Sequence, residues 1–186
     1  MVYVALLRGI NVGGKNKVDM KQLKNVFEQA GMEHVKTYIN SGNIVFVNRT
    51  ETKSKIPSIL EKAILEGFGL EIKVLVLDLD DYKQVMAALP DTWRNDDQMK
   101  SDVLFIWEEF DNESVLEKLP VRQDVDTVMY VNRAILWSVD RKNVTKSGMN
   151  KIIGTELYKK MTVRNVNTTR KIFDLMLAAE KLDQSH

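Results

Sequence analysis

The residues best suited to chemistry lie in one basic loop near the start of the chain. The segment Arg8–Lys17 reads Arg-Gly-Ile-Asn-Val-Gly-Gly-Lys-Asn-Lys. Glycines permit backbone conformations that other residues avoid, and they let a ligand approach the main chain. Such a loop, when it leads into a helix, can hold phosphate with backbone N–H groups, and its cations add attraction. The loop therefore indicates an anion-binding site, and the alternative is a turn whose lysines are only solvated.

This loop follows neither of the common phosphate-binding patterns. The G-x-x-x-x-G-K-[ST] spacing is absent, and no Ser or Thr follows Lys15 to hold Mg²⁺. The dinucleotide pattern G-x-G-x-x-G is absent as well. The cofactor, if there is one, is therefore unknown from the sequence.

A second basic segment lies late in the chain. Residues 141–171 carry 9 basic and 1 acidic side chain, whereas residues 78–126 carry 5 basic and 14 acidic ones. Within the basic segment, Asn167 or Thr168 is a suitable N-cap for a final helix. Arg170 and Lys171 would then oppose the helix dipole in its first turn, and a bound anion would relieve that repulsion. The alternative is that both side chains reach into solvent.

Other kinds of site are poorly supported by the composition. The chain has no cysteine and two histidines, so a thiol nucleophile or a thiolate metal site is excluded. The carboxylates in Asp78-Leu79-Asp80-Asp81 could bind a divalent cation, but we expect Asp78 or Asp80 to cap a helix instead. We predict no metal site, and no pair of carboxylates indicates acid–base catalysis.

The compartment and the partners follow from equally simple features. No apolar run approaches the ~20 residues that a membrane span needs. The apolar start of the chain is too short for a signal-peptide core and predicts a buried strand. A cytoplasmic protein without membrane contact is expected, and its oligomeric state is unknown.

The first half of the chain predicts a βαββαβ order. Val2–Arg8 is an apolar strand, and a helix capped by Asp19 ends at Gly31. Strands on both sides of the Asn40–Asn43 turn form a hairpin. A helix that stops near Gly67 and Gly69 and a strand at Glu71–Leu77 complete the order, which is that of a ferredoxin-like unit. Tyr3, Tyr38 and Phe46 are expected in the core rather than as a surface for stacking bases.

The second half predicts the same order less clearly. A connecting helix at Asp80–Leu89 and a loop at 91–101 precede a strand at Val103–Trp107. The elements expected after it are a short helix at Ser114–Leu119, strands at Thr127–Val131 and Ala134–Val139, helices at Met149–Lys160 and Asn167–Leu182, and an extended segment at Thr162–Arg164 between those two helices. The predicted class is α+β, with two tandem ferredoxin-like subdomains at 1–78 and 102–186, a connection at 79–101 and a C-terminal helix.

Three motifs resemble a known bacterial family. The segments 5–18 (ALLRGINVGGKNKV), 38–46 (YINSGNIVF) and 162–168 (TVRNVNT) are similar to the signatures of the domain-of-unknown-function 1697 family. Val166 stands where that family usually has Trp, so an apolar residue is kept but a stacking surface is not. The resemblance implies a two-part α+β fold of ferredoxin-like units, and no established activity, substrate or cofactor.

These observations predict one composite site. Because strand one pairs with strand three in such a unit, the glycine loop should lie beside the Ser41-Gly42-Asn43 turn. The predicted ligand-binding residues are Arg8, Asn11, Gly13, Gly14, Lys15, Lys17, Ser41, Asn43, Lys146, Ser147, Arg164, Asn165 and Thr168.

Three functions fit this set. The first is binding of an anion, either nucleic acid or a phosphorylated small molecule, with cations for charge and amides for orientation. The second is a phosphate-handling enzyme that uses Lys15 or Lys146 as a clamp and Ser41 or Ser147 as nucleophile. The third is a non-catalytic interaction protein in which Asn11, Asn43 and Asn165 are buried and only hold loops.

Overall fold

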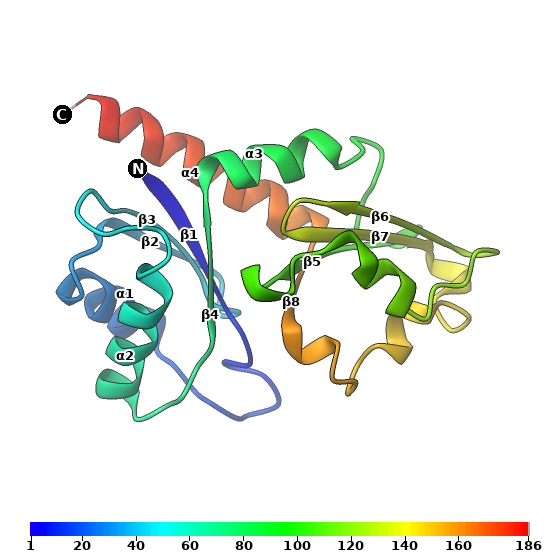
Figure 1. Cartoon of the computed structure of the whole chain (residues 1–186), viewed down its shortest axis with the longest axis horizontal. Helices are drawn as coiled ribbons and strands as arrows, with labels where there is room; N and C mark the ends of the chain where they lie inside the picture. The colour runs from blue at the N-terminus through cyan, green and yellow to red at the C-terminus, as the bar shows by residue number, and fades with distance from the viewer. Residues whose placement is uncertain (186) are drawn as a thin grey trace. The chain divides into compact units, whose positions relative to one another are not determined.

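The computed structural model describes residues 1–185, which form two compact units. One unit comprises Met1–Tyr82 and the chain from Ile172 onward, and the other comprises Lys83–Lys171. Each unit contains one four-stranded antiparallel sheet (Figure 1), so the predicted α+β class is confirmed. Among the described residues, no helix is long and apolar enough to cross a bilayer.

The sheet of the first unit has the order β2-β3-β1-β4. Strand β1 is central and pairs antiparallel with both neighbours, for example Leu6 with Asn43 of β3 and with Leu75 of β4. The elements along this part of the chain are β1 (Val2–Leu7), α1 (Met20–Gln29), β2 (Glu33–Tyr38), β3 (Asn43–Val47), α2 (Ile56–Phe68) and β4 (Val74–Asp78).

Helices α1 and α2 form where their capping residues and apolar spacing predict them. The carboxylate of Asp19 accepts a hydrogen bond of 2.8 Å from the Gln22 amide, and α2 ends at Gly69 with a left-handed φ of 67°. Leu23 and Phe27 of α1 pack with Leu60 of α2 in the core. Because strand side chains alternate, this core rests on the sheet face that carries Tyr3, Ala5 and Leu7. Tyr3 stacks on Phe46 with ring centroids 5.7 Å apart, and both are buried, as predicted, whereas Tyr38 is only half-buried.

The second unit has the sheet order β6-β7-β5-β8. Its strands are β5 (Met99–Ile106), β6 (Asp126–Val131), β7 (Ala134–Asp140) and β8 (Met161–Asn165). Strand β5 begins earlier than predicted, since residues 99–101 pair with β7 instead of lying in a loop. The segments between these strands hold only short 3₁₀ turns, η1 (Glu108–Phe110), η2 (Glu113–Lys118), η3 (Arg141–Asn143), η4 (Gly148–Lys151) and η5 (Tyr158–Lys160).

The predicted α-helix over Met149–Lys160 is wrong. The chain there contains η4 and η5 and a left-handed glycine, Gly154, with φ 84°. A helix cannot continue through that conformation without losing its i→i−4 hydrogen bonds. The backbone of Gly148 also packs so closely on Pro120 that an added Cβ would lie 1.7 Å from the Pro120 carbonyl oxygen. Tertiary packing therefore overrides the helical spacing of Met149 and Ile152.

Two helices connect the units along the chain. Helix α3 (Leu79–Ala88) begins in the first unit, and α4 (Val166–Gln184) begins in the second unit and ends in the first. The cap of α4 is Asn165, whose Oδ1 accepts a hydrogen bond of 2.9 Å from the Thr168 amide, so the predicted cap at Asn167 or Thr168 is wrong. The helix starts one residue after β8 because Asn165 still pairs with Asp102. Arg170 consequently lies beyond the first turn and donates to the carbonyls of Trp93 and Pro90.

Candidate functional site

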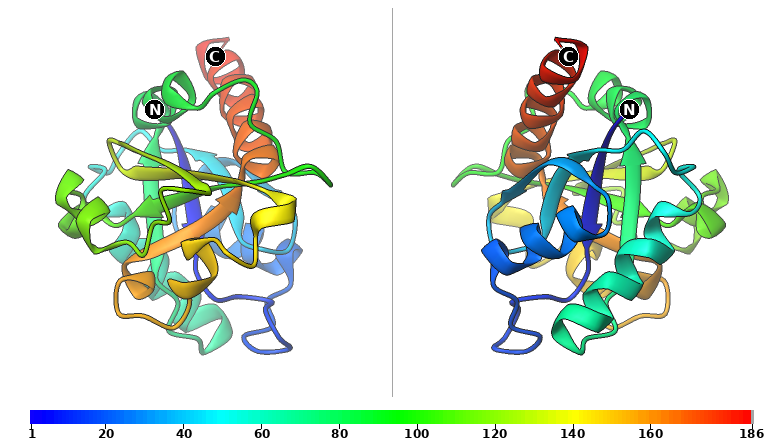
Figure 2. Two further views of the ribbon diagram at one scale, coloured as in Figure 1. Left: turned by 90° about the vertical axis from the view of Figure 1, so that its right-hand side faces the viewer. Right: turned by 90° about the vertical axis from the view of Figure 1, so that its left-hand side faces the viewer.

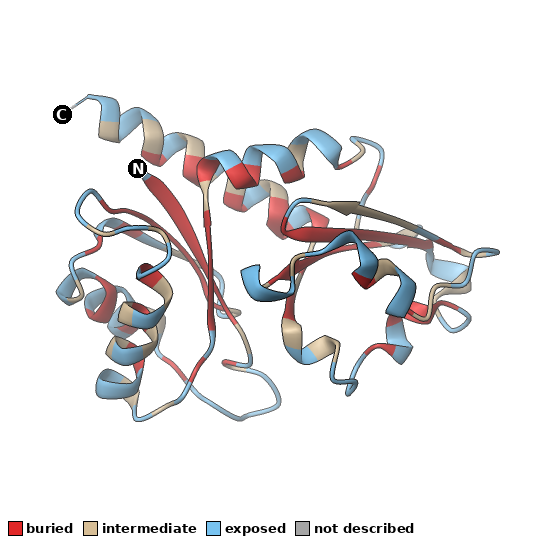
Figure 3. Cartoon of the chain, viewed as in Figure 1, coloured by how far each residue is buried: buried red, intermediate tan, exposed pale blue. Residues whose placement is uncertain are grey.

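Residues 8–17, which we call the basic finger, form a miniature hairpin that projects from the end of β1 (Figure 2). Val12 and Lys15 pair across it, with a hydrogen bond of 3.0 Å from the Lys15 amide to the Val12 carbonyl. Gly13 and Gly14 form the tip with φ of 58° and 75°, and two consecutive positive φ values are what a type I′ hairpin turn requires. The predicted glycine loop is thus an ordered hairpin whose residues 12–17 are all exposed (Figure 3).

Two asparagine side chains hold the base of the finger. Asn11 Nδ2 donates to the carbonyls of Val18 (3.0 Å) and Asn40 (2.9 Å), and Asn11 Oδ1 accepts from the Val18 amide (2.8 Å). Asn16 Nδ2 donates to the Gly9 carbonyl at 2.9 Å. Asn11 and Asn16 both have left-handed φ, near 50°, which asparagine tolerates better than most residues. Both amides therefore build the loop.

The finger lies beside the β2–β3 turn, as the strand order predicted. Besides the Asn11 contact with Asn40, the Leu7 amide donates to the Gly42 carbonyl at 2.9 Å. Gly42 has φ 82°, and a Cβ there would lie 2.7 Å from Leu7 Cβ and 2.8 Å from Ile10 Cδ1. Only glycine allows the turn to approach the finger this closely.

Ser41 and Asn43 complete the turn with internal contacts. Asn43 is fully buried, and its Nδ2 donates to the Tyr38 carbonyl and to Ser41 Oγ, each at 3.0 Å. A buried amide in this position needs such partners, since an unpaired one costs about 1–3 kcal/mol. Asn43 thus holds the turn in the shape that Asn11 contacts.

The lysines around the finger differ from several others in the first unit, which form ion pairs. Lys24, Lys53, Lys62 and Lys73 each pair with a carboxylate within 4 Å. Lys15, Lys17 and Lys21 are exposed and form no ion pair within residues 1–185. Arg8 is half-buried at the base of the finger. Lys36 and Lys55 are likewise exposed without an ion pair in the described part of the chain, so what distinguishes the finger is the grouping of Lys15 and Lys17 on one hairpin, with Lys21 four residues further along the chain.

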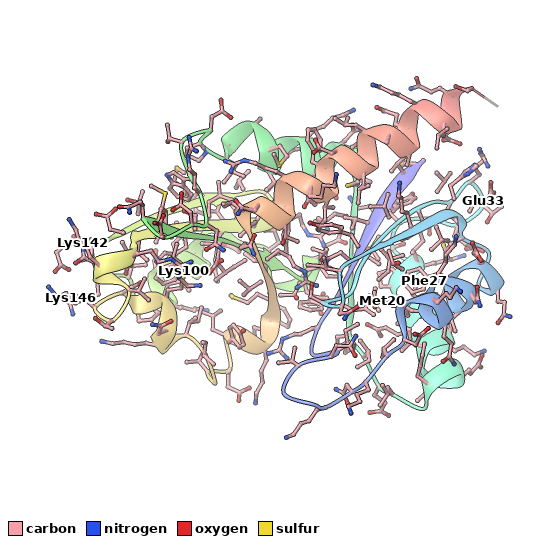
Figure 4. The ribbon with its side chains drawn as sticks, turned by 180° about the vertical axis from the view of Figure 1, so that it is seen from behind. Met20, Phe27, Glu33, Lys100, Lys142 and Lys146 are labelled. Atoms are coloured by element: carbon pink, nitrogen blue, oxygen red, sulfur yellow. The ribbon has the colours of Figure 1, made fainter. Side chains whose placement is uncertain are left out.

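A groove of about 700 Å³ adjoins the finger. Its apolar lining residues, which we call its floor, are Val18, which is buried, and Met20 and Phe68, which are half-buried. Figure 4 labels Met20 at the start of α1. The exposed rim carries Lys17, Lys21, Gln22 and Asn40. Asp19 also lines the groove, and its carboxylate is engaged by the Gln22 amide.

In the second unit, Ser147 belongs to a buried network rather than an open site. Its side chain caps η4, and its hydroxyl donates to Asp126 Oδ1 at 2.5 Å. Asp126 Oδ2 accepts from the amides of Gly148 (2.9 Å) and Arg122 (2.8 Å). Burial acts to raise the pKa of Asp126, but these hydrogen bonds outweigh it and hold the pKa below its ordinary value. Lys146, next in the chain, is exposed and points into solvent (Figure 4).

The remaining predicted residues surround the start of α4. Arg164 is buried, and its Nη1 donates to Thr162 Oγ1 (2.9 Å) and the Val163 carbonyl (2.8 Å). Asn165 is the helix cap, Thr168 is buried, and Val166 is fully buried in the position where the resembling family usually has Trp. That the motifs of both units contribute to one site stays a prediction.

The carboxylates singled out in the sequence have structural partners. Asp78 Oδ1 accepts from the Asp81 amide at 2.8 Å, so Asp78 caps α3 as predicted, and Lys53 Nζ bonds both Asp78 and Asp81. Within residues 1–185, no three His, Asp or Glu side chains are grouped so as to hold a metal ion. No catalytic arrangement is assembled around Ser147, whose hydroxyl is enclosed with 1% of the residue exposed.

Sequence reasoning missed seven of the ten residues that line the groove: Val18, Asp19, Met20, Lys21, Gln22, Asn40 and Phe68. Lys21 and Gln22 could have been found, because the cap at Asp19 places them in the first turn of α1. Phe68 gave no signal, since an aromatic residue at the end of an amphipathic helix is most simply a packing residue.

The chain is similar to one protein family and to a solved structure. A family model described as "Protein of unknown function (DUF1697)" matches residues 1–137, which include the finger and the β2–β3 turn. A solved structure described as the conserved bacterial protein SP0830 from Streptococcus pneumoniae is similar to the chain, with 30% sequence identity and a TM-score of 0.82. The similarity covers 94% of this chain and 98% of that one. No curated protein matches the sequence.

Proposed function

The chain belongs to the DUF1697 family of proteins of unknown function, and on that premise we propose that it binds a phosphate-bearing ligand at the basic finger. The observation that carries the proposal is the rigid hairpin that presents Lys15 and Lys17, with Lys21 close by in sequence, all three exposed and without an ion pair in residues 1–185. Within those residues, none of these three lysines forms an ion pair that stabilises the fold, so their charges remain available to a ligand.

Rigidity adds to the suitability of the finger for binding. A flexible loop loses conformational freedom when it closes on a ligand, and each ordered residue opposes binding by about 1–2 kcal/mol. Here Asn11, Asn16 and the Gly13-Gly14 turn have already fixed the backbone. The lysines are therefore presented on a scaffold that needs little reordering.

The other two functions receive less support. A phosphate-handling enzyme would need an accessible nucleophile, and Ser147 is enclosed and donates to Asp126. The other candidate, Ser41, is half-buried and accepts a hydrogen bond from Asn43 Nδ2 within the β2–β3 turn. A purely structural role agrees with Asn11, Asn43 and Asn165, whose amides are hydrogen-bonded internally. It does not account for the grouping of Lys15, Lys17 and Lys21, so we assign the amides to construction and these cations to the ligand.

The predicted site residues divide accordingly. In this proposal Arg8, Lys15 and Lys17 supply charge, Gly13 and Gly14 allow close approach to the backbone, and Asn11, Ser41 and Asn43 maintain the shape. A role for Lys146, Ser147, Arg164, Asn165 and Thr168 in binding stays a prediction.

The test is binding of fluorescently labelled mixed-sequence RNA and DNA and of inorganic polyphosphate, measured by anisotropy at 50 and 200 mM salt. We expect binding that weakens steeply with salt, and a double variant Lys15→Gln, Lys17→Gln whose log–log salt slope is smaller by about 2. Lys55→Gln is the matched control, because Lys55 is exposed in the same unit, also unpaired and remote in sequence from the finger. The proposal fails if no probe binds at 50 mM salt, or if the control loses as much affinity as the double variant.

We also propose finer statements on fold and location. The strand order β2-β3-β1-β4, with α1 and α2 packed on one face, supports a ferredoxin-like topology for the first unit. The similar strand order of the second unit supports a variant of it with 3₁₀ turns in place of helices. A cytoplasmic location is supported by the absence of cysteine, and subdomain boundaries at 78 and 102 stay predictions.

A further inference from the structure

The groove beside the finger combines three kinds of side chain that suit different parts of one ligand. Its apolar lining residues include Phe68 and Met20. Its exposed lining residues include Lys17, Lys21 and Asn40, which carry ammonium and amide groups. A nucleotide has the matching parts: an aromatic base, hydrogen-bonding base edges and a phosphate.

The floor offers an aromatic surface without a partner of its own. Phe68 is half-buried at the end of α2, packs against the core of the first unit, and contacts no other aromatic ring in the described chain. In proteins that bind single strands, aromatic side chains stack on bases irrespective of sequence, because every base has a π face.

The rim offers polar groups that the fold does not use. The Asn40 side-chain amide makes no hydrogen bond within residues 1–185, in contrast to Asn11 and Asn43, whose amides are engaged. Gln22 donates only at 3.4 Å to the Gly67 carbonyl, which leaves its Oε1 available. Amides of this kind can both donate to and accept from base edges.

The open shape of the groove favours a polymeric ligand over a small molecule. Pockets for small ligands are concave and enclose most of the ligand surface. This groove is open and lies against a protruding hairpin, with Lys15 on the hairpin and Lys17 and Lys21 along its edge. An open groove lets a chain continue past the bound unit, and lysines in sequence along it can contact successive phosphates.

From these observations we infer that the groove binds single-stranded nucleic acid, with a base stacked over Phe68 and the flanking phosphates held by Lys15, Lys17 and Lys21. The inference rests on the proposed function and deepens it, because it assigns the ligand class to the same site. Asp19 is the opposing charge in the groove, and its carboxylate accepts from the Gln22 amide as the cap of α1. A duplex is a poor ligand, since its bases are stacked within it and cannot cover the ring.

The experiment compares the affinities of the full chain for labelled 12-nucleotide single-stranded RNA and DNA, the corresponding blunt duplexes, and inorganic polyphosphate, at 50 mM salt. We expect the single strands to bind about tenfold more tightly than the duplexes. Phe68→Leu keeps an apolar side chain but removes the π face, and should weaken single-strand binding about fivefold while leaving duplex and polyphosphate binding unchanged. Asn40→Ala should weaken single-strand binding by about two- to fivefold with the thermal unfolding midpoint unchanged.

The outcomes separate this inference from the proposed function. Equal affinity for single strands and duplexes, or full single-strand affinity in Phe68→Leu with an unchanged unfolding midpoint, overturns the nucleic-acid assignment. The finger as an anion site still stands in that case if Lys15→Gln, Lys17→Gln weakens all probes. Polyphosphate that binds as tightly as the single strands also overturns the assignment, and failure of every probe to bind overturns both proposals.

Discussion

Asn11 offers the sharpest test of how the basic finger is built. The substitution Asn11→Ala removes three hydrogen bonds, two to the Val18 backbone and one to the Asn40 carbonyl. It also leaves a residue with a Cβ and no local hydrogen bond at φ 52°. Asparagine is one of the few residues that occupy this region readily, and alanine is not.

The expected loss follows from these contacts. A net contribution of about 0.5–1 kcal/mol per hydrogen bond is reasonable for a partly exposed site. The left-handed backbone adds about 1 kcal/mol of strain for alanine. We therefore expect Asn11→Ala to lower the free energy of unfolding by about 2.5–4 kcal/mol, or by less if the finger opens locally before the unit unfolds.

The assay combines urea unfolding with amide hydrogen exchange. Urea unfolding measures the global loss, and exchange at the Val18 and Lys15 amides reports local opening, since these amides donate to Asn11 Oδ1 and to the Val12 carbonyl. Asn40→Ala is the matched control, because its side-chain amide has no internal partner and its loss should stay within about 0.5 kcal/mol.

The same variant tests the link between shape and binding. Asn11→Ala keeps every lysine, so any fall in affinity for nucleic acid or polyphosphate would come from a finger that must be reordered on binding. The reasoning is refuted if Asn11→Ala unfolds within 0.5 kcal/mol of the wild type with its Val18 amide equally protected. It is also refuted if Asn40→Ala is destabilised to the same extent.

Three further predictions concern the second unit. Gly148→Ala should lower the free energy of unfolding by about 3 kcal/mol, because its Cβ would lie 1.7 Å from the Pro120 carbonyl oxygen; an unchanged urea midpoint would contradict this. Because the folded state holds the pKa of Asp126 below its ordinary value, the Asp126 carboxylate contributes stability that is present above about pH 4 and lost as pH falls through the folded-state pKa. The urea midpoint of Asp126→Asn should therefore depend less on pH in that window than the midpoint of the wild type. Parallel plots of midpoint against pH for the two proteins would count against this. Burial and the hydrogen bond to Asp111 raise the pKa of Tyr130 to about 12. The stabilising contribution of the neutral phenol is therefore present below pH 10 and lost as pH rises through about 12. Tyr130→Phe should remove the phenolate absorbance step with the highest pKa, and identical titration curves for wild type and variant above pH 11 would argue against this.

Local signals predicted the first unit well because its elements are fixed by local chemistry. Asp19 caps α1, Gly69 ends α2, and the Ser41-Gly42-Asn43 turn joins β2 to β3. In each case the residue that marks the boundary also satisfies the backbone there, through a cap or a positive φ. The position of the turn beside the finger then followed from the antiparallel pairing of β1 and β3.

The second unit was predicted less well because distant contacts determine its conformation. The spacing of Met149 and Ile152 favours a helix, yet Gly148 packs on the Pro120 backbone and Ser147 on Asp126. Neither contact can be inferred from a sequence window, since the partners lie more than 20 residues apart. The cap of α4 was ambiguous for a different reason: Asn165, Asn167 and Thr168 are all good caps, and the end of β8 selects the first of them.

The candidate site shows the same division between what a residue type suggests and what its neighbours decide. Asn11 and Asn43 were expected to orient a ligand, because amides both donate and accept, but the same property lets them satisfy backbone groups of the finger and the turn. Lysine has no comparable use inside these loops, since it offers only donors on a long, strongly hydrated chain. An exposed lysine that pairs with no carboxylate, such as Lys15 or Lys17, adds almost nothing to stability. Its substitution therefore reports on binding alone, whereas a substitution of Asn11 reports on binding through the shape of the finger. Measuring affinity and stability together for Lys17→Gln and Asn11→Ala separates the groups that contact the ligand from those that position them.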